Sequence, residues 1–106
     1  MTEKRQPTYD LKAFKAAFNR VEKLAVTGTA LRSAAALGFG RDEIVATIQT
    51  MQREHFYKSM TAYADHRIWQ DVYHVTSAVG VLYIKFTADV LAEFLLLSFK
   101  EINDDR

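Results

Sequence analysis

The chain has 106 residues, of which 49 % are apolar and 25 % charged, and its formal net charge is +1. These values are typical of one compact soluble domain, so they exclude collagen-like, low-complexity and disordered chains. The length also excludes a two-half dinucleotide-binding fold, and the absence of cysteine excludes disulfide scaffolds, thiolate metal sites and cysteine nucleophiles.

No apolar segment points to a membrane. The N-terminal residues are polar, without the apolar core of a signal peptide. The longest apolar-rich stretch, residues 90–99, is far shorter than the roughly 20 residues of a spanning helix. We therefore expect a single cytoplasmic domain over residues 1–106, with no membrane association.

The first half of the chain predicts three helices. One helical face is formed by apolar residues at steps of three and four, namely Leu11, Phe14, Phe18 and Val21. An Ala-rich helix is expected over about residues 30–37, ended by Gly38 and Gly40. A third helix is expected from residue 41 to residue 51, because Asp42 and Glu43 suit the positive end of the helix dipole.

The second half changes to the period of a strand. Residues 69–79 are rich in aromatic and β-branched side chains, and residues 81–87 and 94–100 alternate. In the last strand we expect Leu95, Leu97 and Phe99 on one face and Leu96, Ser98 and Lys100 on the other. Residues 53–66 show neither a clear helical period nor a clear strand period. The sequence therefore predicts an α+β domain with N-terminal helices packed on a small antiparallel sheet of two or three strands.

Three histidines, His55, His66 and His74, fall within 20 residues of the chain, and Asp65 precedes the second. They admit a metal site of histidine and carboxylate ligands, although their spacing matches no known ligand pattern. A pair of histidines acting as acid and base in RNA cleavage is an alternative, because imidazole titrates near neutral pH. Plain surface residues are the third interpretation.

Strand alternation also predicts a polar face on the sheet. Tyr83 and Lys85 share one face of their strand, Gln70 and His74 share one face of the preceding strand, and Lys100 closes the last strand. If these faces coincide, the set suits a phosphodiester, since lysine neutralises phosphate oxygens while tyrosine and glutamine donate hydrogen bonds. A solvated face without function is the alternative.

Beyond these patterns, a long central stretch resembles one known family. Residues 56–61 (FYKSMT), Tyr63, Asp65-His66 and residues 68–73 (IWQDVY) are similar to the central signature of the MqsR family of bacterial toxins. Residues 81–85 (VLYIK) and 98–101 (SFKE) resemble its next and closing strands. One departure is His74-Val75-Thr76, where the family often has an Arg-Pro pair, so one cationic contact to RNA is expected to be weaker or pH-dependent.

The resemblance implies an mRNA-cleaving toxin of a type II toxin–antitoxin pair with the RelE-like α+β fold. It implies cleavage without metal or other cofactor, at short GC-containing sites such as GCU. Its active-site residues fall on Lys58, Gln70, Tyr83 and Lys100, and further substrate contacts are expected from Tyr57, Met60, His74 and Lys85. The implied partner is an MqsA-type antitoxin, through which any contact with DNA is indirect.

The residue chemistry fits attack by the RNA's own 2′-hydroxyl. Lys58 and Lys100 would stabilise charge, Tyr83 would bond a phosphate oxygen or deliver a proton, and the neutral Gln70 would position the phosphate. His66 and His74 stay possible acid–base residues. The rival class is a non-catalytic RNA- or protein-binding module that acts as a regulator together with its antitoxin.

Overall fold

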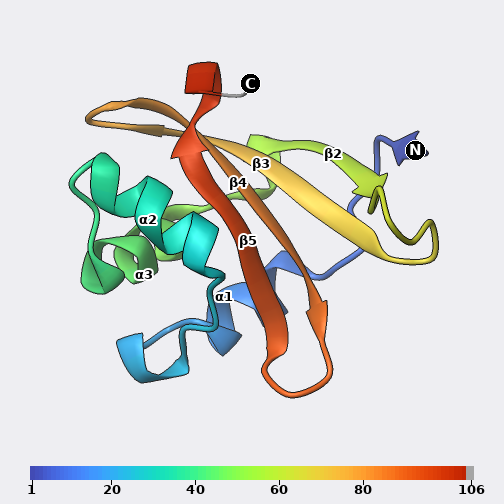
Figure 1. Cartoon of the computed structure of the whole chain (residues 1–106), viewed down its shortest axis with the longest axis horizontal. Coiled ribbons are helices and arrows are strands. Elements are labelled where there is room, and N and C mark those ends of the chain that lie inside the picture. Colours follow the sequence, from blue (N-terminus) through green and yellow to red (C-terminus); the bar gives the residue numbers. More distant parts are fainter. Residues whose placement is uncertain (105–106) are drawn as a thin grey trace.

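The computed structural model describes residues 1–104, which form an antiparallel sheet with three helices on one of its faces (Figure 1). The elements follow in the order β1 (Glu3–Lys4), α1 (Leu11–Ala17), α2 (Gly28–Ala36), α3 (Arg41–Thr50), β2 (Phe56–Thr61), β3 (Trp69–Ser77), β4 (Gly80–Asp89) and β5 (Glu93–Glu101). Neighbouring strands in the sheet are neighbours in sequence, β1-β2-β3-β4-β5. The predicted α+β class is confirmed. Within residues 1–104, no helix is long and apolar enough to cross a membrane.

Local hydrogen bonds set the start of each helix. The Asp10 side chain accepts the Lys12 N–H at 3.0 Å ahead of α1, and the Thr27 hydroxyl accepts the Ala30 N–H at 3.1 Å ahead of α2. Ahead of α3, the Gly40 N–H donates to the Glu43 carboxylate at 2.8 Å. The first helix is shorter than expected, because it ends at Ala17 and Val21 lies in a separate 3₁₀ turn.

The core lies between the helices and one face of the sheet. Phe14 of α1 stacks on Phe86 of β4, with ring centroids 3.7 Å apart and planes 5° apart. The other core residues from helix α3 and the strands include Ile44, Ile48, Tyr73, Val75, Leu82, Ile84 and Phe99, all of them buried. Because alternate residues of β3, β4 and β5 fill this core, the residues between them point to the opposite face of the sheet, which carries no helix (Figure 1).

Two expectations about the sheet were wrong. The sheet has five strands, whereas at most three were expected. Strand β2 lies in residues 53–66, where the sequence showed no clear helical or strand period, and β1 adds a short edge strand beside it. In β5, Leu96 is buried with Phe99, although alternation separates them. A register shift explains this, because Lys85 pairs with Ser98 while Phe86 pairs with Leu96, which leaves Leu97 as an extra residue.

Two sets of hydrogen bonds, one near residue 2 and one at residues 8–9, help to fix the N-terminal segment to the sheet. The Thr2 N–H donates to the Thr61 hydroxyl at 2.9 Å, and the Thr61 N–H donates to the Thr2 carbonyl at 2.8 Å. Further along, the Asp71 carboxylate accepts the Thr8 N–H at 3.1 and 3.0 Å and the Tyr9 N–H at 2.9 Å. Asp71 is 0 % exposed, so its charge is compensated by these donors within the protein.

Candidate functional site on the open face of the sheet

Strand pairing gathers the predicted site residues on the sheet face that carries no helix, here called the open face. One row across the strands joins Lys58, Val72, Lys85 and Ser98. The next row joins His74, Tyr83 and Lys100, and Met60 pairs with Gln70. Directly paired residues have Cβ atoms about 5 Å apart. The polar face expected from alternation is therefore present, built by β2, β3, β4 and β5.

A β-bulge in β2 brings Tyr57 over this face. The register shifts between Phe56 and Lys58, so Tyr57 has no paired position of its own. Its ring stacks on His74, with centroids 4.1 Å apart and planes 20° apart. Tyr57 is 43 % exposed, so the side of its ring away from His74 is open to a ligand. An exposed aromatic face beside cations is a platform on which an RNA base can stack.

Lysine side chains lie at both ends of the aromatic row. Lys58 Nζ lies 5.5 Å from the Tyr57 ring centroid, and Lys100 Nζ lies 5.3 Å from that of Tyr83. His74 lies between them, 5.9 Å from Tyr83 by ring centroids. Both cations are within cation–π range of their rings. The arrangement places positive charge on either side of a strip of stacking surface, which suits a phosphodiester with its bases.

An acidic residue that the sequence analysis missed also reaches the open face. Glu3 of β1 pairs with Met60, and its carboxylate accepts a hydrogen bond from Lys58 Nζ at 2.7 Å. Lys58 holds the pKa of the Glu3 carboxyl below its usual range through this bond and its charge. A two-residue strand leaves no pattern in the sequence, so nothing there could have shown this ion pair.

His74 is held in an environment that favours its neutral form. Burial lowers its pKa below the usual 6.5, and the charge of Lys58 lowers it further. Its Nε2 atom is buried and has no hydrogen-bond partner within the described part of the chain, residues 1–104. A neutral imidazole can accept a proton at neutral pH, so His74 is chemically suited to act as a general base.

The other two histidines lie in different settings. His55 Nδ1 accepts the Gln52 N–H at 2.9 Å within the 3₁₀ turn Arg53–His55. His66 is exposed in the loop between β2 and β3, next to Asp65, which binds Arg67 at 3.0 Å. Among residues 1–104, no three histidine, aspartate or glutamate side chains gather as metal ligands. The structure thus places His74 with the predicted site residues and His66 in a hairpin loop.

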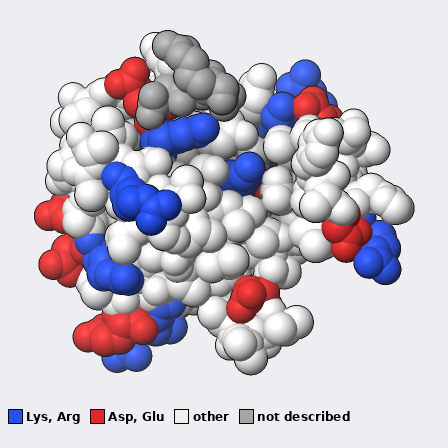
Figure 2. Space-filling model, in the orientation of Figure 1, with Lys and Arg blue, Asp and Glu red and all other residues white. Residues whose placement is uncertain are grey.

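Charge over the rest of the surface is mixed. In the view of Figure 2, acidic and basic side chains are scattered around the visible surface without a large area of one sign. This agrees with a net charge of +1. Attraction of a polyanion would therefore depend on the local lysines of the open face more than on the field of the whole protein.

Comparison with known proteins supports the resemblance seen in the sequence. Residues 6–101 match the family model described as motility quorum-sensing regulator, toxin of MqsA. The mRNA interferase toxin MqsR of Escherichia coli (strain K12) is 40 % identical over 99 residues, which cover 93 % of this chain and 98 % of that protein. The predicted site residues of the open face and the buried core lie within the matched range, whereas Glu3 lies outside it. The chain belongs to the MqsR family of toxins.

Proposed function

We propose that this chain is an mRNA-cleaving toxin of a toxin–antitoxin pair, and that the open face is its active site. The observation that carries the proposal is the convergence of Lys58, Gln70, Tyr83 and Lys100 from four strands onto one face with an exposed aromatic surface. Family membership supports the class of activity, since the relative from Escherichia coli is named an mRNA interferase.

In the proposed reaction the RNA supplies its own nucleophile. The 2′-oxygen forms a bond to the adjacent phosphorus, and the bond from phosphorus to the 5′-oxygen breaks. The proton of the 2′-hydroxyl goes to a base, and the leaving 5′-oxygen takes up a proton. The products are a 2′,3′-cyclic phosphate and a 5′-hydroxyl. No water is consumed in this step, and the protein has to position the phosphate, stabilise its extra negative charge and move two protons.

The open-face residues divide these tasks. Lys58 and Lys100 stabilise the charge on the phosphate oxygens, and Gln70, which cannot titrate, positions the phosphate. Tyr83 pairs directly with both His74 and Lys100, so its hydroxyl can bond a phosphate oxygen or protonate the leaving group. His74 is neutral and can take the 2′-hydroxyl proton. Tyr57, Met60 and Lys85 contact the flanking nucleotides, while His66 keeps at most a peripheral role in its loop.

The finer properties follow the family resemblance. We propose cleavage at GCU or related GC-containing sites, without a metal ion. An MqsA-type antitoxin would be the partner, and any contact with DNA would pass through it. Inhibition of translation and growth follows from loss of mRNA.

A cleavage assay with a matched variant tests the assignment. A defined RNA containing one GCU is incubated with the protein in excess chelator, and an RNA of the same length without GCU is the substrate control. We expect Lys58→Ala to lower kcat by about 10²–10³-fold. Lys23→Ala removes an equal charge on the helical side, where Lys23 Nζ bonds the Ala16 carbonyl, and should leave cleavage unchanged.

The product ends decide between cutting and binding. A cyclic phosphate and a 5′-hydroxyl from the wild type, with folded but inactive Lys58→Ala, would establish the proposed site. RNA that is bound and left intact would favour the non-catalytic module instead. Activity lost in chelator and restored by zinc or manganese would reject the metal-free reaction.

A further inference from the structure

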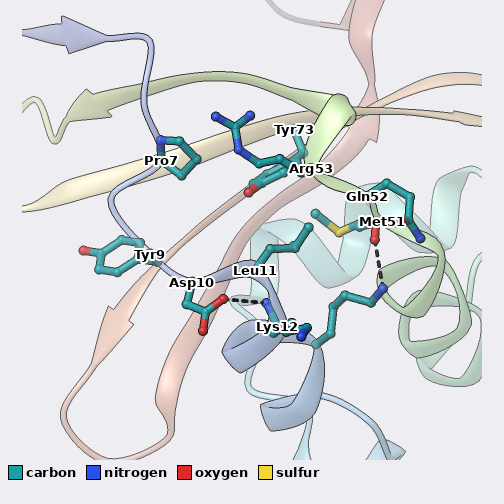
Figure 3. A pocket seen from close by; sticks show the side chains of 10 residues that line it. Pro7, Tyr9, Asp10, Leu11, Lys12, Met51, Gln52, Arg53 and Tyr73 are labelled. Atoms are coloured by element: carbon teal, nitrogen blue, oxygen red, sulfur yellow. Dashed lines mark hydrogen bonds between the residues drawn. The ribbon is translucent and has the colours of Figure 1, made fainter.

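A cavity of about 450 Å³ lies on the helical side of the sheet, away from the open face. It is bounded by the start of α1, the 3₁₀ turn Arg53–His55 and the ring of Tyr73 from β3 (Figure 3). Its volume falls within the range of pockets that hold small ligands. The proposed ribonuclease reaction uses none of the residues that line it.

Tyr73 gives this cavity a buried donor with no partner. Its side chain is 0 % exposed, and its hydroxyl has no hydrogen-bond partner among residues 1–104. Figure 3 shows the hydroxyl directed toward the space bounded by Pro7, Leu11 and Arg53. A buried hydroxyl without a partner costs free energy, so an acceptor placed in the cavity would be stabilised by it.

Tyr73 stays a donor across the physiological range. Burial raises the pKa of its hydroxyl to about 12, and the charge of Asp71 acts in the same direction. The charge of Arg53 opposes the shift, and Arg53 lines the same cavity as Tyr73. A group that bonded both would receive a neutral donor and a charged donor.

The wall of the cavity combines cations with apolar surface. Lys12, Lys15 and Arg53 contribute three positive charges and Asp10 one negative charge. Lys15 Nζ donates to the Met51 carbonyl at 2.9 Å, and Asp10 accepts the Lys12 N–H at 3.0 Å, so these side chains also fix the wall (Figure 3). The side chains of Leu11 and Met51 supply apolar contact.

We propose that this cavity binds a small organic anion, made of a compact apolar or aromatic body and one carboxylate or phosphate group. The anionic group accepts hydrogen bonds from the Tyr73 hydroxyl and the Arg53 guanidinium, and the body lies against Leu11 and Met51. Carboxylate and phosphate oxygens both suit an arginine, since its planar group donates two parallel hydrogen bonds.

Amide NMR of the full chain with simple probes tests the proposal. Benzoate and phenyl phosphate represent the two head groups, and benzyl alcohol is the uncharged control of similar body. We expect at least one of the two anions to shift the amide signals of residues 9–12 and 51–53 at millimolar concentration. Benzyl alcohol should shift none of them. A difference between the two anions identifies the head group that the cavity prefers.

Four variants locate the binding. Tyr73→Phe and Arg53→Gln should each weaken it by at least about tenfold, because each removes a hydrogen bond to a charged group. Tyr73→Phe should leave the urea midpoint unchanged or higher, since it removes a hydroxyl without a partner. Arg41→Gln, an exposed arginine at the start of α3, should bind as the wild type does, and so should Lys58→Ala.

Several results would overturn the proposal. Absence of shifts with both anions would do so, as would equal shifts with benzyl alcohol. Unchanged affinity in both Tyr73→Phe and Arg53→Gln would show that the head group lies elsewhere. Shifts centred on Lys58 and Lys100 would assign the anions to the open face. The readout is binding alone, so the result does not depend on whether the chain cleaves RNA.

Discussion

The buried carboxylate of Asp71 allows a quantitative test of how the N-terminal segment is held. Asp71→Asn keeps the size of the side chain and removes its charge. Two backbone donors, the N–H groups of Thr8 and Tyr9, then share one amide oxygen, and the amide NH₂ is turned toward groups that also donate. A hydrogen bond to a charged group contributes about 1.5–3 kcal/mol, against about 1 kcal/mol for a neutral pair. We therefore expect a loss of about 2–3 kcal/mol in the free energy of unfolding.

Urea unfolding followed by tryptophan fluorescence measures this loss, with the m-value as a check that the transition stays two-state. Asp89→Asn is the matched control. Asp89 also accepts two backbone N–H groups, from Leu91 at 3.1 Å and Ala92 at 2.9 Å, but it does so in the solvent-facing β4–β5 turn. Asparagine suits such a turn, so this variant should lose less than about 0.5 kcal/mol. Equal losses in the two variants would refute the argument from burial.

Three further changes test other parts of the structure. Glu3→Gln should lower KM for RNA with kcat little changed, because the Glu3 carboxylate competes with phosphate for Lys58; a fall in kcat would instead show that Glu3 assists the reaction. His74 has a pKa below its unfolded value of 6.5, so between these two values the unfolded chain binds more protons, and stability should fall as pH drops from about 6.5 through the lowered pKa. Urea titrations from pH 5 to 7.5 should show this dependence of the unfolding free energy on pH in the wild type and in His66→Asn, but not in His74→Asn. If the dependence survives in His74→Asn, another group causes it. Gly80 has φ of 113°, a conformation that strains any side chain, so Gly80→Ala should cost about 1 kcal/mol or more in the same unfolding assay, and an unchanged midpoint would contradict the strain.

The helices and most of the core could be predicted from the sequence because their patterns are local. Apolar steps of three and four placed Phe14 and Phe18 on one buried face, and alternation placed Leu82, Ile84 and Phe86 on another. Each pattern depends only on the geometry of its own element, so no knowledge of the partners is needed. The predicted ends of β4 were also close to the observed ends, because Gly80 and Asp89 mark the turns on either side of this strand.

The same pattern analysis did not predict the two strands that contain bulges, β2 and β5, correctly. The bulge at Tyr57 breaks alternation within a six-residue strand, so β2 showed no clear period. In β5, the extra residue Leu97 reverses the faces of everything before it, which is why Leu96 was assigned to the wrong face while Lys100 was assigned correctly. A bulge is decided by pairing with a neighbouring strand, and a run of leucines carries no signal for where it falls.

The candidate site was predicted by two different routes. Alternation placed Gln70 with His74, and Tyr83 with Lys85, on one face of their strands and left open whether these faces coincide; strand pairing shows that they do, with Lys100 on the same face. Lys58 came only from the family resemblance, because β2 was not recognised as a strand. The chemical roles of all these residues remain predictions, since a shared face gives proximity and the cleavage assay has to give function.

The two sets of hydrogen bonds that hold the N-terminal segment, at Thr2–Thr61 and at Asp71, should act independently. The variants Asp71→Asn and Glu3→Gln test this. The Thr2–Thr61 pair holds β1 on β2 and so keeps Glu3 beside Lys58, whereas Asp71 holds residues 8–9 farther along the chain. Asp71→Asn should therefore lower stability without changing KM, and Glu3→Gln should change KM without lowering stability much. If Asp71→Asn lowered KM as strongly as Glu3→Gln does, the segment would move as one unit, and access of RNA to Lys58 would depend on a carboxylate on the opposite face of the sheet.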